Sequence, residues 1–242
     1  MEEHDIAEMA LMEQTYWWHQ GKRRLIDSVL SKYYKGQAGK ILDYGCGAGE
    51  NLKLLSAYGE TFGADTSHLA VDFCKEKKLP HVHLIQPGEV PEGPFRLITA
   101  FDVVEHIRDD IDILTKFHKA IEPNGFLFIS VPAYRFLWSE HDEALMHVRR
   151  YVASELRAKL TMTGFDVIRI TYAVTFVFFP ILFYRLVRGI FPQSYDKPKV
   201  SYVELPGFLN SLFYQSLVLE SKLIKFMNLP FGCSLLVIAR RK

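Results

Sequence analysis

The feature that most constrains the fold is a short apolar run that ends in an aspartate and is followed by three glycines at alternate positions. It lies at residues 40–50, where Asp43 precedes Gly45, Gly47 and Gly49. Glycine has no side chain and tolerates positive φ, so such a loop lets the backbone approach a ligand closely. The spacing lacks the lysine of a P-loop and falls short of the full dinucleotide fingerprint. We therefore expect a strand, a ligand-binding glycine loop and a helix, in that order.

Segments of strand and helix character alternate along the rest of the chain, which favours an α/β fold with a mostly parallel sheet and helices on both faces. The expected strands are Ile41–Tyr44, Thr61–Ala64, Val82–Ile85, Leu97–Phe101, Phe126–Val131, Val167–Thr171 and Leu235–Ala239. The expected helices are Asn51–Tyr58, His68–Lys77, Asp110–Ile121 and a segment through Thr161 that Ser154 caps. A turn is expected at Glu122–Gly125, because Pro and Gly there follow a helical pattern.

Composition narrows the class of protein. The chain has 242 residues, 49% of them hydrophobic, which is enough to bury the core of one domain. Its net charge is +1, so no strong field favours nucleic acid. Three widely spaced cysteines argue against a disulfide framework, and no apolar run is long enough to cross a bilayer. With no signal-peptide pattern at the start, these features favour a cytoplasmic protein.

Several separated motifs resemble those of the class I S-adenosylmethionine-dependent methyltransferases, including the ubiquinone-pathway O-methyltransferase type. Asp43-x-Gly-x-Gly-x-Gly resembles the first motif, Asp65 ends the second strand, and Phe101–Ile107 resembles the Asp-x-x-Glu-His segment after the fourth strand. The resemblance covers roughly residues 40–166. It implies a seven-stranded Rossmann-like methyltransferase sheet, S-adenosyl-L-methionine as cofactor, and methyl transfer as the activity.

The resemblance also implies cofactor-binding roles at the carboxyl ends of the strands, where open α/β sheets bind ligands. Asp65 is expected to accept hydrogen bonds from both ribose hydroxyls, with a helix cap as the alternative role. Gln86 stands where the family commonly has an aspartate that accepts from the adenine amino group. Backbone at Phe101 and Asp102 is expected to hold the methionine amino group. The complete cofactor set is Asp43, Gly45, Cys46, Gly47, Gly49, Asp65, Thr66, Gln86, Phe101 and Asp102.

The segment Trp138–Tyr151, directly after the fifth strand, is dense in titratable groups and is expected to lie over the transferred methyl group. Three interpretations remain open: a histidine acts as general base, the cluster binds a metal ion, or arginines and acidic residues pair and brace the loop. The arginines could also bind a carboxylate or phosphate of the substrate. The bracing pairs would be Arg149 and Arg150 with Asp142 and Glu143. The predicted catalytic residues are His141, His147 and His106, the predicted substrate contacts are Trp18, Trp138, Arg149, Arg150 and Tyr151, and no metal is predicted.

The chain is expected to be one methyltransferase domain with two additions. Residues 1–37 would form a helical lid whose aromatic residues exclude water, 38–172 the cofactor-binding core, and 232–242 the last strand. The apolar, aromatic segment 173–231 would be a helical insertion between strands six and seven. It would contact a membrane surface through 173–192 at the inner face, form a hydrophobic lid, or form a helix pair packed on the core or on a second copy in a homodimer.

The expected function is methyl transfer to a small-molecule or lipid-like (including lipid-linked) acceptor, at oxygen by analogy with the resembling family, with a histidine as base. Aligning the acceptor with the methyl group would supply much of the rate acceleration. A non-catalytic module that binds S-adenosylmethionine or a nucleotide is the alternative, and an NAD-linked dehydrogenase is a third interpretation. The intact Asp43, the glycines and Asp65 argue against a decayed site.

Overall fold

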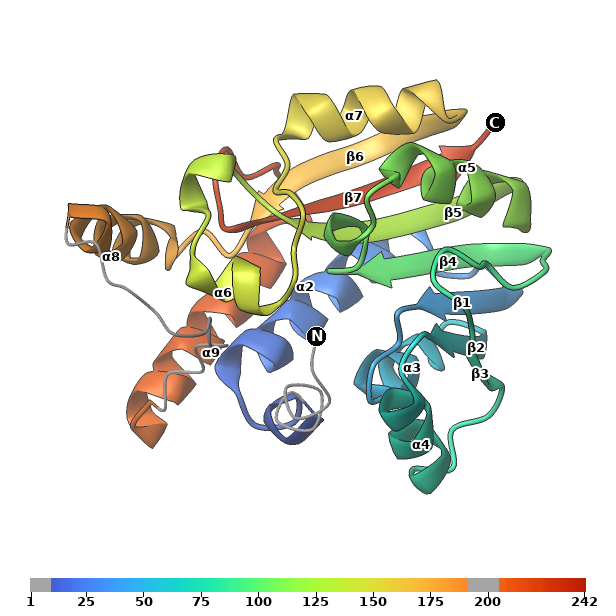
Figure 1. Ribbon diagram of the computed structural model, residues 1–242, viewed down its shortest axis with the longest axis horizontal. Coiled ribbons are helices and arrows are strands. Elements are labelled where there is room, and N and C mark those ends of the chain that lie inside the picture. The colour runs from blue at the N-terminus through green and yellow to red at the C-terminus, as the bar shows by residue number, and fades with distance from the viewer. Residues whose placement is uncertain (1–9, 191–204) are drawn as a thin grey trace.

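Seven strands form one sheet in the order β3-β2-β1-β4-β5-β7-β6 (Figure 1). The computed structural model describes residues 10–190 and 205–242, with only the backbone described for 186–190. β1 to β5 run parallel, whereas β7 is antiparallel to both of its neighbours, β5 and β6. The strands are β1 (Lys40–Tyr44), β2 (Glu60–Asp65), β3 (Val82–Leu84), β4 (Phe95–Phe101), β5 (Ile121–Pro132), β6 (Phe165–Ala173) and β7 (Ser234–Arg241). The predicted mostly parallel, seven-stranded sheet is confirmed.

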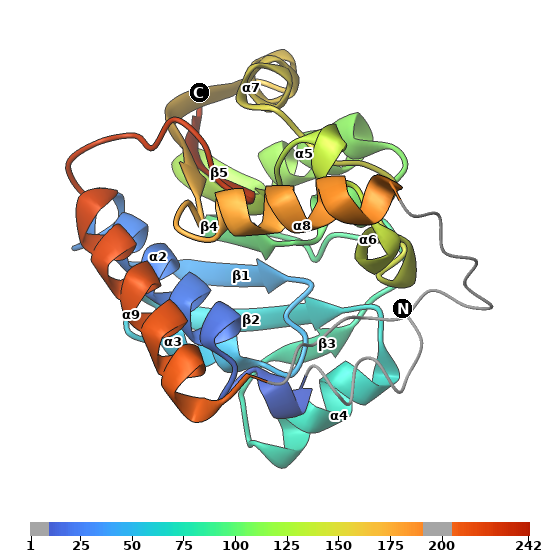
Figure 2. The ribbon, with the colours of Figure 1, turned by 90° about the vertical axis from the view of Figure 1, so that its left-hand side faces the viewer.

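Helices cover both faces of this sheet (Figures 1 and 2). α5 (Asp110–Ala120) and α7 (Ala153–Met162) pack on one face, while α2 (Trp17–Tyr33), α3 (Glu50–Leu55) and α9 (Gly207–Leu223) contribute to the core on the other. α4 (His68–Glu76) lies beside β2 and β3 at the edge.

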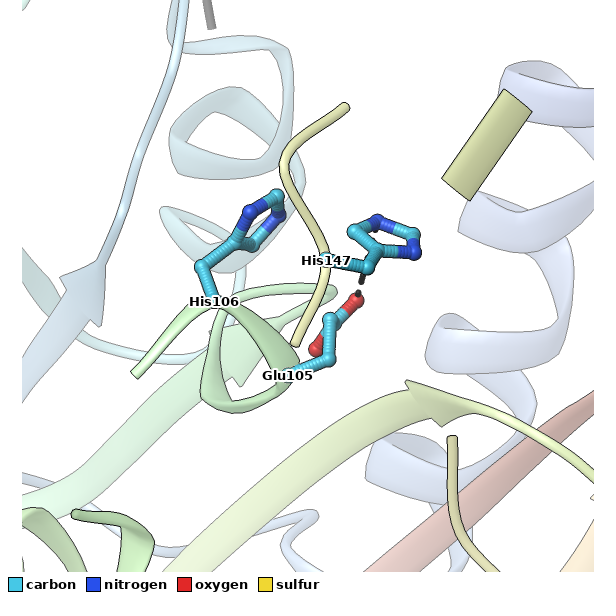
Figure 3. A group of neighbouring side chains, drawn as sticks. All are labelled: Glu105, His106 and His147. Carbon is cyan, nitrogen blue, oxygen red and sulfur yellow. Dashed lines mark ion pairs between the residues drawn. The ribbon is translucent and has the colours of Figure 1, made fainter. Parts of the chain in front are cut away.

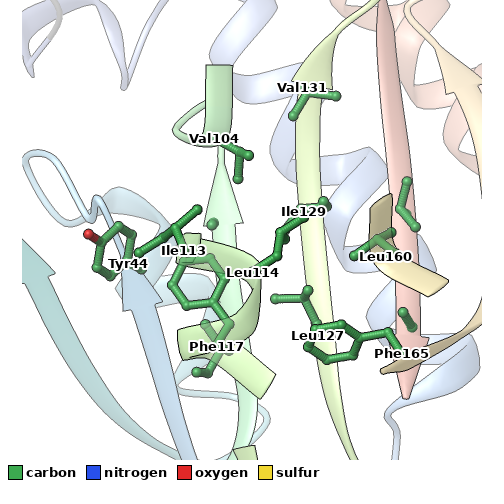
Figure 4. Packing of buried hydrophobic residues seen from close by; sticks show 14 of the residues in the cluster. Tyr44, Val104, Ile113, Leu114, Phe117, Leu127, Ile129, Val131, Leu160 and Phe165 are labelled. Atoms are coloured by element: carbon green, nitrogen blue, oxygen red, sulfur yellow. The ribbon is translucent and has the colours of Figure 1, made fainter. Parts of the chain in front are cut away.

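Two cores result because successive side chains of a strand point to opposite faces. In β5, Leu127 and Ile129 belong to the core under α5 and α7, whereas Phe126 and Phe128 belong to the core under α2 and α9. Figure 4 shows the first of these cores, where Phe117 of α5 lies among the strands. β5 is therefore apolar from Phe126 to Ile129, as a strand buried on both faces requires.

Short elements stand above the carboxyl ends of the strands. η1 (Val104–His106) follows β4, and both η2 (Arg135–Leu137) and α6 (Glu140–Ala144) follow β5. α8 (Phe178–Ile190) follows β6. Of the residues predicted for the acceptor end of the site, His106 lies in η1 and His141 in α6, while Trp138 and the residues from His147 to Tyr151 lie in the segments that flank α6.

Two local predictions were wrong. Val152, not Ser154, is the N-cap of α7, and no side chain caps that helix. The expected turn at Glu122–Gly125 lies within β5, where Asn124 adopts a φ of 62° and the register with β4 shifts between Phe95 and Leu97. A local irregularity therefore absorbs Pro123 and Gly125 without ending the strand.

The segment between β6 and β7 contributes two helices. α9 lies along α2 (Figure 2), and its Leu217 is fully buried there, so this half of the segment packs on the core. Residues 191 and 192, part of the predicted membrane contact, lie outside the described residues. No helix in the described ranges combines the length and the apolar character needed to span a bilayer.

Candidate functional site

A cavity of about 1860 Å³ lies at the carboxyl ends of β1, β2, β4 and β5. Loops after these strands form its floor, and residues of α2, α6 and α8 complete its walls. The predicted site residues that line it are Trp18, Gly45, Cys46, Gly47, Asp65, Thr66, Phe101, Asp102, His106, Trp138, His141, His147 and Arg150. Residues predicted for the cofactor and residues predicted for the acceptor therefore face one continuous space.

The glycine loop after β1 is compact, and neighbouring side chains leave no room for a Cβ at Gly45 or Gly49. Gly45 has a φ of 75°, and a Cβ there would lie 2.4 Å from Cγ2 of Val103. Gly47 has a φ of 53° and borders the cavity. Gly49 is the N-cap of α3 and does not line the cavity. The loop thus presents bare backbone to a ligand at the tip of β1.

Asp65 ends β2 and faces the glycine loop. The Gly47 N–H donates to its Oδ2 at 2.9 Å, and the Ser67 N–H donates to its Oδ1 at 2.9 Å. Ser67, rather than Asp65, is the N-cap of α4. An ionised carboxylate has about four acceptor positions, so this one retains capacity for a diol. The side chain is half-buried at the cavity wall, as the ribose role requires.

Asp43 lies behind the glycine loop instead of lining the cavity. It is 1% exposed, and the Thr99 hydroxyl donates to its Oδ1 at 2.7 Å. Its Oδ2 is buried without a hydrogen-bond partner. Burial raises the pKa of Asp43 to about 7, against the opposing effect of the Thr99 hydrogen bond. A buried carboxyl group with a spare oxygen therefore supports the loop from below.

Lys22 is a site residue that the sequence did not reveal. It projects from α2 and forms an ion pair with Asp102, which follows β4 and has a φ of 56°. The Ser130 hydroxyl donates to the other Asp102 oxygen at 3.0 Å. Burial alone would raise the pKa of Asp102, but Lys22 and Ser130 hold it below its usual value. The partners are 80 residues apart, and no local spacing indicates the contact.

Asp142 of α6 organises the acceptor end of the cavity. Arg150 donates to both of its oxygens, at 2.7 Å from Nε and 3.0 Å from Nη2, and His147 Nδ1 lies 2.9 Å from Oδ1. The backbone N–H of Ser139 also donates to Oδ2, at 2.9 Å. Burial alone would raise the pKa of Asp142. Hydrogen bonds from His147 and Arg150 nevertheless hold this pKa well below its usual value. Asp142 is thus a buried anion that fixes both Arg150 and His147.

Glu105, His106 and His147 form a second group beside it (Figure 3). One ligand atom from each lies within 4.8 Å of the others, and His147 Nε2 is 3.9 Å from Glu105 Oε1. Glu105 is fully buried and neither carboxyl oxygen has a hydrogen-bond partner. Burial and the charge of Asp102 raise its pKa, which favours the protonated form. Two imidazoles and a carboxyl group suit proton transfer and are also a donor set that a divalent cation accepts.

The other two predicted catalytic histidines differ from His147. Burial lowers the pKa of His106 to about 4, and it lowers the pKa of His141 to about 4. Both imidazoles are therefore neutral at physiological pH. The Nδ1 atom of His147 lies at hydrogen-bond distance from the Asp142 carboxylate, which leaves Nε2 toward Glu105 and His106.

Besides Asp43 and Gly49, three more predicted site residues do not line the cavity. The Gln86 side chain is exposed, and its backbone N–H bonds Glu89. Arg149 and Tyr151 both donate to Asp110, at 2.7 and 2.8 Å. The predicted bracing is therefore correct for Arg150 with Asp142, but Arg149 pairs elsewhere, because the backbone turns its side chain toward α5.

The amino-acid sequence is similar to those of known proteins. A family model described as "Methyltransferase domain" matches residues 17–170. The chain is 29% identical over 101 residues to the mitochondrial ubiquinone biosynthesis O-methyltransferase of Schizosaccharomyces pombe, a match that covers 38% of this chain and 37% of that protein. It is 28% identical over 145 residues to the ubiquinone biosynthesis O-methyltransferase of Coxiella burnetii, covering 54% and 62%. The chain thus matches between about a third and two thirds of the length of these relatives.

The fold has solved counterparts as well. The S-adenosylmethionine-dependent methyltransferase from Mesorhizobium loti superposes with a TM-score of 0.61 at 13% identity, covering 90% of this chain and 98% of that one. At this identity the likeness concerns the fold alone.

Proposed function

The chain belongs to the methyltransferase-domain family that matches residues 17–170, and from this membership we propose that it transfers a methyl group from S-adenosylmethionine to an oxygen of a small, lipid-like acceptor. The predicted family, fold and cofactor are confirmed by the family match and the fold counterparts. The acceptor class, the oxygen and the catalytic base are the proposal, suggested by the ubiquinone-pathway relatives.

The observation that carries the proposal is the continuity of the cavity. It joins the glycine loop and Asp65 at one end to His147 and Arg150 at the other. A group-transfer enzyme needs both reactants in one space, held in line and shielded from water. A module that only binds the cofactor would not need the ordered Asp142–His147 pair at the far end.

The residues present fit the cofactor. Bare backbone at Gly45 and Gly47, together with the Asp65 carboxylate, would hold the adenosyl part, and the segment at Phe101 and Asp102 would hold the amino acid part. When bound, S-adenosylmethionine supplies an already activated methyl group. The protein then has to place the acceptor oxygen and remove its proton.

We assign the base to His147. Asp142 accepts from its Nδ1–H, so the ring is fixed in orientation and Nε2 is the free basic atom. The same carboxylate stabilises the positive charge that the ring acquires when Nε2 takes a proton. His106 and His141, whose pKa values are near 4, would instead line the acceptor pocket as neutral groups.

The proposal of a lipid-like acceptor is supported by the apolar wall that α8 and the residue before it form in the cavity. Val177, Pro180 and Ile181 line the cavity from this side. Outside the cavity, Phe179 and Phe183 of the same helix are 59% and 69% exposed. An element that is apolar both inward and outward suits transfer of an amphipathic acceptor from a membrane surface.

The test uses the full chain with S-adenosylhomocysteine calorimetry and with methyl transfer to a panel of phenols and glycosyl lipids. For His147→Gln, which retains a donor for Asp142, we expect cofactor affinity within about twofold of the wild type and turnover reduced by about 10²–10⁴. His83→Gln, an exposed histidine on β3, is the matched control and should leave both unchanged.

Each alternative has its own outcome. Full turnover in His147→Gln would leave bracing as the role of this residue. If a chelator abolishes turnover and a divalent cation restores it, a metal ion bound by Glu105, His106 and His147 acts in catalysis instead of a histidine base. Tight cofactor binding with no methylated product from any acceptor class would favour the non-catalytic module.

A further inference from the structure

Arg185 of α8 is a cavity residue with a different environment from the arginines that the sequence singled out. It lines the cavity between Tyr184 and the α6 segment, and its side chain is 19% exposed. Its Nη1 lies 3.6 Å from Asp142 Oδ2, too far for a hydrogen bond. That Nη1 is buried and has no hydrogen-bond partner. A buried donor without an acceptor costs free energy, so its persistence needs an explanation.

Asp142 cannot supply the missing acceptor, because its oxygens are already occupied. Oδ1 accepts from Arg150 at 2.7 Å and from His147 at 2.9 Å. Oδ2 accepts from Arg150 at 3.0 Å, from the Ser139 backbone at 2.9 Å and from the Ser139 hydroxyl at 3.3 Å. A carboxylate offers about four acceptor positions, and these five donors fill them.

The two guanidinium groups at Asp142 also repel each other. Arg150 and Arg185 lie 2.7 and 3.6 Å from the oxygens of Asp142, and Glu140 of α6 lines the same cavity. Burial and then the repulsion of Arg150 lower the pKa of Arg185 to about 10, against the attraction of Asp142. An anion placed here would relieve both the unpaired donor and the repulsion.

The neighbours of Arg185 determine what kind of anion fits. Pro180 and Ile181, one turn away on α8, and Leu137 and Trp138 of the β5–α6 segment line the same cavity. These side chains offer apolar contact, and Ser139, Glu140 and His141 add polar groups to the same cavity without a second positive charge. The site therefore suits a charged group on an otherwise apolar molecule.

We propose that Arg185 binds an anionic group, phosphate or carboxylate, carried by the amphipathic acceptor of the methyl group. This inference rests on the proposed function, since it assigns one end of the same acceptor to the same cavity. It also reassigns a role within the acceptor end of the cavity: Arg150 is hydrogen-bonded to Asp142 and Arg149 to Asp110, whereas Nη1 of Arg185 has no hydrogen-bond partner. A planar guanidinium with unused N–H groups is well suited to either anion.

The experiment measures binding by calorimetry on the full chain saturated with S-adenosylhomocysteine. The probes are octyl phosphate, octanoate and the neutral octyl β-glucoside, each below its micelle concentration. We expect wild-type protein to bind one or both anions and to bind the glucoside at least about tenfold more weakly. Arg185→Met should weaken anion binding by about tenfold or more, and Arg185→Lys should retain part of it.

Arg135→Met is the matched control, because Arg135 is exposed in η2 and does not line the cavity. It should change anion affinity by less than about twofold. Equal anion affinity in Arg185→Met and wild type, equal binding of the glucoside, or no binding of either anion would each overturn the inference. The affinity for S-adenosylhomocysteine is measured in every variant as a check that the protein is folded. If the wild type does not bind S-adenosylhomocysteine, the proposed function is refuted. If it binds S-adenosylhomocysteine but neither anion, only this inference is refuted.

Discussion

At the scale of single residues, Asp65 shows how one carboxylate serves both structure and ligand. Its two oxygens hold the N–H groups of Gly47 and Ser67, so it ties the glycine loop to the start of α4. The acceptor positions that remain face the cavity. The same side chain would therefore shape the cofactor loop and accept the ribose hydroxyls.

Removing this carboxylate should weaken the cofactor complex. For Asp65→Ala we expect the free energy of S-adenosylhomocysteine binding to fall by about 1.5–3 kcal/mol, because charged hydrogen bonds are lost. Calorimetry measures the change. Asp72→Ala, an exposed aspartate on α4 paired only with Lys75, is the control and should have no effect. An unchanged dissociation constant in Asp65→Ala would mean that another group binds the ribose.

The predicted residues that line the cavity include those whose position depends on local sequence alone. Asp65 ends β2 and Asp102 directly follows β4, so a strand pattern is enough to bring them to one edge of the sheet. Lys22 could not be predicted to line the cavity, because it meets Asp102 across 80 residues of chain. Arg149 and Arg150 could not be told apart, since adjacent positions differ only in the direction that the folded backbone gives them.

At the scale of elements, the strands could be predicted because burial on both faces leaves continuous apolar runs. Helix ends were harder: α7 begins after Val152 without a side-chain cap, because packing of Leu156 and Leu160 stabilises it. The placement of α9 along α2 had no signal in the pattern of either helix. Its cause is tertiary packing between segments about 190 residues apart.

Glu220 of α9 holds the chain where it leaves β6. It is fully buried, and the N–H groups of Val174 and Thr175 donate to its two oxygens at 2.5 and 2.8 Å. Val174 has a φ of 61°, an unfavourable conformation for a β-branched residue. The carboxyl group thus fixes a strained turn that leads into α8.

This group should make stability depend on pH. Burial raises the pKa of Glu220 from 4.5 to about 7, against the opposing effect of its backbone hydrogen bonds. Between these pH values the folded chain keeps a proton that the unfolded chain has lost, so this contribution to the free energy of unfolding falls as pH rises. Glu220→Gln stays neutral throughout. The stability of wild type relative to Glu220→Gln, measured by urea unfolding, should therefore decrease by up to about 3 kcal/mol from pH 4.5 to pH 8. Parallel pH curves for the two proteins would contradict this.

At the scale of the whole molecule, the first and last thirds of the chain close the cavity together. Trp17, Trp18 and Lys22 of α2 line it, and so does Phe213 of α9. The two helices are joined by polar contacts at the cavity end, where the Trp17 N–H donates to Asn210 Oδ1 at 3.0 Å. α2, which belongs to the segment predicted as a lid, therefore packs against α9 of the segment between β6 and β7.

Gly21 makes this close packing possible and offers a direct test of it. A Cβ at Gly21 would lie 2.2 Å from Cδ1 and 2.7 Å from Cβ of Leu217, so Gly21→Ala has to push α9 away from α2. The gain in helix propensity is about 1 kcal/mol, and overpacking costs typically about 1–3 kcal/mol, so we expect net destabilisation in urea unfolding. Amide hydrogen exchange should become faster in α9 and at the start of α2, while the sheet stays protected. Gly207→Ala is the control, because a Cβ there meets nothing within 4 Å. If Gly21→Ala proves as stable as Gly207→Ala, with α9 equally protected, the two helices do not depend on each other and the lid must be held by the core alone.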